Sequence, residues 1–171
     1  MSSVYLDHVE GIKNPKIGLI NIGEEPSKGS ELYQKSYSLL EKELPNFIGN
    51  VEGRNIMNTE ADVLVCDGFV GNTIIKFAEG WILSFTDMIK EKIMSKTRYK
   101  IGAQMIQPAL ADMRNQFDYE EHGGTPLLGV NGISIVCHGA STSKAIMNSI
   151  ILAQKSVNEK VIEAYLGSEN E

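Results

Sequence analysis

The stretch from Asp62 to Asn72 constrains the fold of this chain more than any other, because an apolar run passes there directly into a polar, glycine-containing segment. Residues 63–66 are Val, Leu, Val and Cys, which is typical of a strand covered on both faces. The residues that follow the run are Asp67, Gly68, Gly71 and Asn72. Ligands of open α/β sheets bind beyond the carboxyl ends of the strands, and helix N-termini attract anions. This stretch therefore predicts a polar turn that binds a small anion, with phosphate as the first candidate.

Strands and helices alternate along the chain of 171 residues, a length that suits one domain or one half of a two-domain enzyme. The segments that predict strands are residues 16–20, 46–51, 63–66 and 133–136. The segments that predict helices are residues 30–44, 73–94, 95–113 with an interruption at Pro108, and 143–165. This alternation predicts a layered α/β fold with a mostly parallel sheet.

The helix expected over residues 73–94 has an unusually broad apolar face. Its members are Ile74, Phe77, Ala78, Trp81, Ile82, Phe85, Met88 and Ile89. Such a face predicts burial between layers or in a subunit interface. Residues 93–106 mix three cationic side chains with apolar ones, a pattern that suits the surface of an anionic membrane. An ordinary exposed helical hairpin is the alternative.

The net charge and the cysteine content argue against nucleic-acid-binding and metal-binding proteins. A formal net charge of -6 argues against general nucleic-acid binding, which needs a basic face. Cys66 and Cys137 both fall in apolar runs, which favours small buried side chains in a reducing compartment over a metal site. No signal-peptide pattern and no apolar run of membrane-spanning length is visible, so we expect a cytoplasmic protein.

Three predicted strand ends have the same composition, with glycine and polar side chains directly after an apolar run. They are residues 21–25, 67–72 and 138–141. If the strands are parallel, all three lie at one edge of the sheet, where glycine allows backbone N–H groups to approach a phosphate. The alternative is that Gly, Asp and Asn serve loop geometry alone.

Four side chains in or near these turns have candidate chemical roles. His138 is the best acid–base group because its ordinary pKa lies near neutrality, and a histidine bonded to its own loop is the alternative. Asp67 could orient a base or a backbone turn. Ser141 suits a helix N-cap better than a nucleophile, since no nucleophile-elbow motif surrounds it. Lys144 could reach an anion at the N-terminus of the last helix, or lie solvated.

Several segments in chain order carry a family resemblance. They are residues 17–25, 46–54 and 62–72, then Tyr119 with Gly123-Gly124, and finally residues 126–132, 138–141 and 144–146. Together they resemble the phosphate acyltransferase family of bacterial phospholipid synthesis, PlsX, over essentially the whole chain. Members of that family are roughly twice as long, and the Asp-Ala-Met-Gly-Gly-Asp motif that opens their N-terminal half is missing here. The chain therefore looks like the C-terminal half of such a protein, over residues 1–171.

The resemblance implies acyl transfer from an acyl-carrier-protein thioester to inorganic phosphate, with no metal or organic cofactor. It implies a three-layer α/β/α fold similar to isopropylmalate dehydrogenases and phosphotransacetylases. It also implies a homodimer with a helical segment at about residues 73–115, and peripheral contact with the inner face of the membrane near residues 95–106.

The resemblance also suggests roles for the candidate residues. The catalytic group would be His138 as proton relay or oxyanion donor, with Asn72 and Asp67. The groups expected to bind or position phosphate and substrate are Asn21, Gly23, Glu24, Gly68, Gly71, Asn131, Gly139, Ser141 and Lys144. Two alternatives stay open: a phosphate acetyl- or butyryltransferase that uses coenzyme A, and a non-catalytic fragment that dimerises or binds partners.

Overall fold

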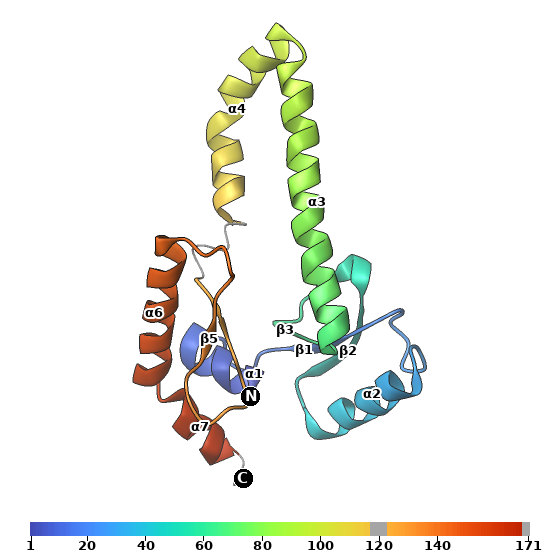
Figure 1. The fold of residues 1–171 in the computed structure, drawn as a ribbon. Helices are drawn as coiled ribbons and strands as arrows, with labels where there is room; N and C mark the ends of the chain where they lie inside the picture. The colour runs from blue at the N-terminus through green and yellow to red at the C-terminus, as the bar shows by residue number, and fades with distance from the viewer. Residues whose placement is uncertain (117–122, 169–171) are drawn as a thin grey trace. The chain divides into compact units, whose positions relative to one another are not determined.

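The computed structural model describes residues 1–116 and 123–168, without the side chains of residues 111–116 and 168. The chain divides into two compact units, Met1–Cys66 with Glu120–Glu171, and Asp67–Tyr119. Figure 1 shows helices and strands in the first unit and two helices, α3 and α4, in the second, and each unit is described by itself.

A parallel three-stranded sheet organises the first part of the first unit, with strand order β2-β1-β3. The central strand β1 (Ile17–Asn21) pairs with β2 (Phe47–Glu52) and with β3 (Val63–Val65). A Cβ atom at Gly18 would lie 2.7 Å from Cγ2 of Val51, so glycine is required where neighbouring side chains close over β1. The three strands predicted at residues 16–20, 46–51 and 63–66 are confirmed, and so is the α/β fold with a parallel sheet.

Helix α2 (Glu31–Glu43) connects β1 to β2 and packs against β2. It ends just before Pro45, as proline disfavours helical backbone in the residue before it. The rings of Tyr37 and Phe47 meet edge-to-face, with centroids 5.2 Å apart. The short helix η2 (Gly53–Asn55) follows β2. The helix predicted over residues 30–44 is therefore confirmed.

The rest of the first unit differs from the prediction in two places. Strand β5 (Ile135–Val136) pairs antiparallel with β4 (Thr125–Pro126), so the fourth predicted strand does not extend the parallel sheet. The single helix predicted over residues 143–165 is two helices, α6 (Ser143–Asn158) and α7 (Val161–Ser168). Lys160, at a positive φ of 52°, separates them.

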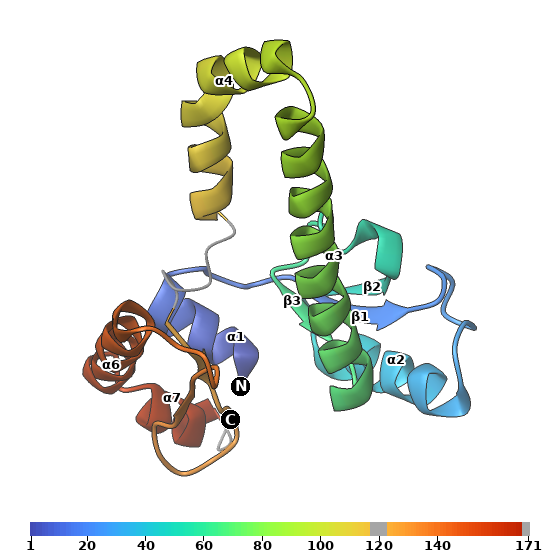
Figure 2. The same cartoon turned by 45° about the horizontal axis from the view of Figure 1, so that its top comes forward.

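A small apolar core holds these C-terminal elements to the N-terminus. It consists of Val9, Val161 and Tyr165, with partly buried neighbours packed around them. Val9 belongs to η1 (Leu6–Glu10), which follows α1 (Ser2–Tyr5). Contacts join α1 to α7, α6 to α7 and α6 to η1, and Figure 2 shows these helices gathered together.

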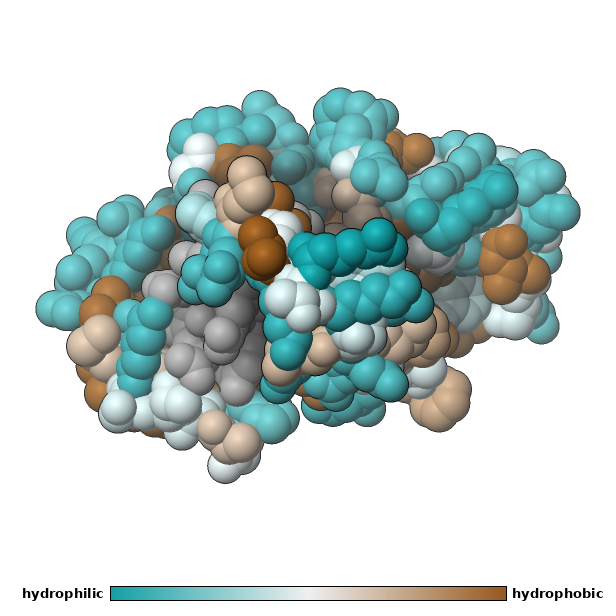
Figure 3. All heavy atoms as spheres, turned by 90° about the horizontal axis from the view of Figure 1, so that it is seen from above, coloured by the Kyte–Doolittle hydropathy of each residue, from teal (hydrophilic) through white to brown (hydrophobic). Residues whose placement is uncertain are grey.

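The second unit is a helical hairpin of α3 (Gly68–Met94) and α4 (Thr97–Gln116). Helix α3 begins at Gly68, five residues earlier than predicted, so residues 68–72 form its first turns rather than a loop. Helix α4 continues through Pro108, and the predicted interruption there is wrong. Figure 3 looks at the molecule from above and shows hydrophobic residues set among hydrophilic ones. Among the helices that the structure describes, none is long and apolar enough to cross a membrane.

Candidate functional site

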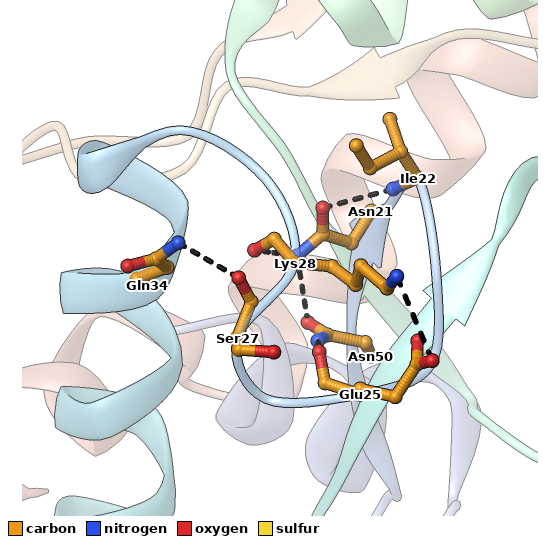
Figure 4. A network of polar contacts seen from close by, with 7 residues as sticks. All are labelled: Asn21, Ile22, Glu25, Ser27, Lys28, Gln34 and Asn50. Atoms are coloured by element: carbon orange, nitrogen blue, oxygen red, sulfur yellow. Dashed lines mark hydrogen bonds and ion pairs between the residues drawn. The ribbon is translucent and has the colours of Figure 1, made fainter.

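The loop after β1 is held by a buried pair of asparagine side chains. Asn21 is 7% exposed and Asn50 is 8% exposed, and Nδ2 of Asn21 donates to Oδ1 of Asn50 at 3.1 Å. The Asn21 amide also donates to the carbonyl oxygen of Lys28 and accepts from the N–H of Ile22. Figure 4 shows both amides turned toward the backbone of the loop. Asn21 therefore shapes the loop, and its assignment to phosphate stays a prediction.

Gly23 and Glu24 lie in the same loop. Oε1 of Glu24 accepts a hydrogen bond from Nδ2 of Asn55 at 3.1 Å. Glu24 and Asn55, together with Glu60, line a polar groove of about 400 Å³ beside β2. Burial, with a contribution from Glu41, raises the pKa of Tyr37, so this lining hydroxyl is neutral near pH 7. Two carboxylates repel an anion, so this groove does not suit phosphate.

Asp67 links β3 to the hairpin by capping α3. Its Oδ1 accepts a hydrogen bond from the N–H of Val70 at 2.9 Å, and its carbonyl oxygen accepts from the N–H of Gly71. The bond from Val70 satisfies a backbone donor that a helix N-terminus leaves open, and the bond from Gly71 is the first i→i−4 bond of the helix. Of the two predicted roles for Asp67, orienting the backbone is the one that these contacts support. Asn72 is exposed on the first turns of α3.

His138 and Gly139 form an exposed turn between β5 and α6. Nδ1 of His138 accepts a hydrogen bond from the N–H of Ala140 at 3.1 Å, and its carbonyl oxygen accepts from the N–H of Ser141 at 2.9 Å. Because a backbone N–H only donates, the hydrogen of the neutral imidazole is on Nε2. The turn therefore fixes His138 as a donor through Nε2.

The N-terminus of α6 follows this turn. Thr142, rather than Ser141, is its N-cap, and Oγ1 of Thr142 accepts from the N–H of Ala145 at 3.3 Å. The prediction that Ser141 caps this helix is therefore wrong. Oγ of Ser141 is buried and has no hydrogen-bond partner among the described residues. Lys144 is exposed in the first turn of α6. A buried hydroxyl without a partner costs free energy, so this position is suited to a polar ligand.

The structure brings only some of the predicted site residues together. His138, Gly139, Ser141 and Lys144 share one turn and the start of α6. Asn131 lies in the loop that joins β4 to β5, at the opposite end of this ribbon from His138. The residues from Asp67 to Asn72 belong to the other compact unit. The convergence of all three turns on one phosphate stays a prediction.

Sequence reasoning missed Asn50, although a polar residue inside an apolar strand signals a hydrogen-bonded network. Nδ2 of Asn50 donates to the carbonyl oxygen of Glu25 at 2.8 Å and so ties β2 to the loop after β1. Gly29 was also missed: its φ is +85°, and a Cβ atom there would lie 2.6 Å from Oδ1 of Asn21. In residues 1–116 and 123–168, no three His, Cys, Asp or Glu side chains are grouped as metal ligands.

The fold and these turns define an α/β protein with a parallel sheet and a candidate anion site at a strand-to-helix turn. Residues 1–164 match the family model described as fatty acid synthesis protein, and the chain belongs to that family.

Curated relatives are similar over nearly the whole chain. The phosphate acyltransferase of Heliobacterium modesticaldum is 48% identical over 164 residues, which cover 96% of this chain and 49% of the relative. The phosphate acyltransferase of Desulfitobacterium hafniense (strain DCB-2) is 51% identical over 164 residues, covering 95% of this chain and 49% of the relative. That of Clostridium acetobutylicum is 48% identical over 163 residues, with shares of 95% and 49%. The chain thus spans about half the length of the curated relatives it matches.

Proposed function

We propose that this chain is the C-terminal portion of a phosphate acyltransferase that transfers an acyl group from acyl carrier protein to inorganic phosphate. The observation that carries this proposal is the 48% identity, over 96% of the chain, to a relative named phosphate acyltransferase. In this proposal the enzyme acts in the cytoplasm and supplies acyl phosphate for phospholipid synthesis.

The proposed step is a substitution at a thioester carbonyl. A phosphate oxygen attacks the carbonyl carbon, a C–O bond forms, and the C–S bond breaks. The sulfur leaves as a thiolate that takes up the proton lost by hydrogen phosphate, giving acyl phosphate and the free thiol of acyl carrier protein. The protein must hold the phosphate close to the thioester and stabilise the negative charge that develops on the carbonyl oxygen.

The start of α6 supplies groups for both tasks. The buried hydroxyl of Ser141 and the first turn of α6 would bind the phosphate, and Lys144 would add positive charge. His138, with its hydrogen on Nε2, would donate to the developing oxyanion. Of the two roles expected for His138, the hydrogen bond at Nδ1 favours the oxyanion donor over the proton relay.

An assay with two polypeptides tests this proposal. The full chain is co-expressed with the part of the Heliobacterium relative outside the match, and acyl phosphate from acyl carrier protein and phosphate is trapped as hydroxamate. Ser141→Ala should raise KM for phosphate about tenfold, while Ser143→Ala, at the exposed start of α6, should leave it unchanged. No hydroxamate from the wild-type pair, or product only with acetyl coenzyme A, would contradict the proposal.

Two substitutions separate the roles of His138. His138→Ala removes the Nε2 donor and should lower kcat by about 10²-fold or more. His138→Gln keeps an N–H donor but transfers no proton, so it should retain more activity than His138→Ala if the donor role holds. Equal loss in both variants would favour the proton relay.

We also propose that the hairpin pairs with a second copy and that its tip, near residues 95–106, touches the membrane. Trp81 and Phe85 stack with ring centroids 5.0 Å apart, yet Trp81 is 55% exposed. Near the tip, Met94 and Ile101 are both 58% exposed, beside Lys96 and other cationic side chains.

The single tryptophan of the chain makes both contacts measurable. Dimerisation should shift Trp81 emission to the blue as concentration rises, and Trp81→Lys should give a monomer by sedimentation. Vesicles with anionic lipid should bind the wild type more strongly than Ile101→Glu. A monomeric wild type, or equal vesicle binding by both proteins, would contradict these two proposals respectively.

A further inference from the structure

Helix α6 turns its small residues inward. Ala145, Ser149 and Ser156 are its buried residues. A Cβ atom at Gly123 would lie 2.4 Å from the backbone nitrogen of Ser149, so chain and helix are in direct backbone contact there. The thiol of Cys137 also donates to Oγ of Ser149 at 3.1 Å. The inward face of α6 is therefore already filled by its own unit.

The opposite face of α6 is apolar and exposed. We call it the outer stripe, and its members are Ile146, Met147, Ile150, Ile151 and Val157. Their exposed fractions run from 42% to 64%. In an α-helix, residues three, four and seven positions apart share a face, so these five side chains form one surface. A helix that is buried on one face and apolar on the opposite face is normally covered on both.

We propose that the outer stripe is the docking surface for the segment of the curated relatives that lies outside their match to this chain. The match covers 96% of this chain but only 49% of the Heliobacterium relative, so the unmatched part of that relative is about as long as this chain. The family match includes all of α6, because it runs to residue 164.

The shape of the surface agrees with such a neighbour. The stripe includes one polar position, Gln154, and Lys144 and Lys155 border it on one edge, beside Met147 and Ile151. Lys155 lies 4.0 Å from a carboxylate oxygen of Glu10 of the same unit. The apolar members of the stripe suit packing against another layer of the same fold. This inference rests on the proposed function, which supplies the partner.

Binding measurements test the inference apart from catalysis. The full chain is co-expressed with the unmatched segment of the Heliobacterium relative, which carries a tag, and the complex is isolated and sized by light scattering. We expect a one-to-one complex. Ile150→Glu should weaken it at least about thirtyfold, because a charge would be buried in an apolar contact. Leu39→Glu, an equally exposed apolar position on α2, should leave it unchanged.

The possible outcomes separate the explanations. Ile150 is 64% exposed, so circular dichroism should show a normally folded Ile150→Glu variant; Ile150→Ser gives a second, uncharged test. No complex with the wild type, or a complex that tolerates both Ile150 variants, would overturn the inference. Self-association of the chain that Ile150→Glu abolishes would instead assign the stripe to a second copy. A complex that forms through the stripe but yields no acyl phosphate would leave this inference standing and reject the proposed activity.

Discussion

The two compact units of the chain treat their apolar residues in opposite ways. In the first unit, Ile17, Leu19 and Val51 are buried between strands and helices, and two buried asparagines pair with each other. In the second, no described side chain from residue 67 to residue 110 is buried, although α3 is rich in large apolar residues. The first unit thus buries several of its own apolar side chains, whereas the hairpin exposes apolar surface that suits a partner.

The largest expected effect tests the close packing of the first unit. Gly123→Ala should lower the free energy of unfolding by about 3 kcal/mol, since Cβ would meet backbone atoms of α6 and the position has a positive φ of 78°. Chemical denaturation followed by circular dichroism measures the loss. Gly132→Ala, where nothing lies within 4 Å, is the matched control. Similar stability for both variants would show that α6 does not pack closely against Gly123.

The next effect concerns the buried asparagine pair. Asn21→Ala leaves the carbonyl oxygen of Lys28 and the amide of Asn50 short of a partner, which should cost about 2 kcal/mol. Thermal unfolding measures this change, with Asn58→Ala at an exposed position as control. A loss of activity without a loss of stability would instead favour a direct role of Asn21 with substrate.

Replacing a glycine of the hairpin by alanine should raise the stability of the protein rather than lower it. Gly80 lies within α3 and nothing lies within 4 Å of a Cβ atom there, so Gly80→Ala should stabilise the helix by about 0.5–1 kcal/mol. Fluorescence of Trp81 during denaturation follows this unit alone. Gly18→Ala in β1 should destabilise, since Val51 lies 2.7 Å from the added atom. A destabilising effect of Gly80→Ala would indicate that another surface packs closely on α3 at that point.

The smallest effect is a pH dependence confined to the first unit. Burial, with smaller contributions from Glu10 and Tyr165, raises the pKa of Tyr5 above its usual value of about 10.0. Above pH 10 the unfolded chain loses the proton that the folded chain keeps, so stability present at neutral pH falls as the pH rises further. Tyr5→Phe should reduce this fall above pH 10, measured by chemical denaturation at a series of pH values. An unchanged slope in Tyr5→Phe would contradict the assignment.

The sequence predicted the elements whose signals are local. The β-branched run at residues 63–66 and the helical spacing before Pro45 identified β3 and α2. The start of α3 was misjudged because Gly68 and Gly71 are typical of turns, whereas the cap formed by Asp67 lets helix begin there. No glycine or proline marks the break at Lys160, and two-residue strands such as β4 carry too little pattern to reveal their direction.

The candidate site was predicted less completely, because contacts between distant residues decide it. His138, Ser141 and Lys144 were recognised as neighbours in sequence, and they are neighbours at the start of α6. The pairing of Asn21 with Asn50, 29 positions later, has no local signal. Nor does any local pattern place Asn131 and His138 at opposite ends of one ribbon.

The strand order β2-β1-β3 also has a consequence for how the chain folds during synthesis. β1 is the central strand, yet it leaves the ribosome first, and its partners Phe47 and Val63 follow 30 and 46 residues after Ile17. Until each partner strand is made, the corresponding edge of β1 has unpaired N–H and C=O groups, and each pairing must close a long loop. Nascent chains that end before Phe47 therefore expose an apolar strand with two open edges, and those that end before Val63 still have one open edge, which makes this early interval prone to aggregation.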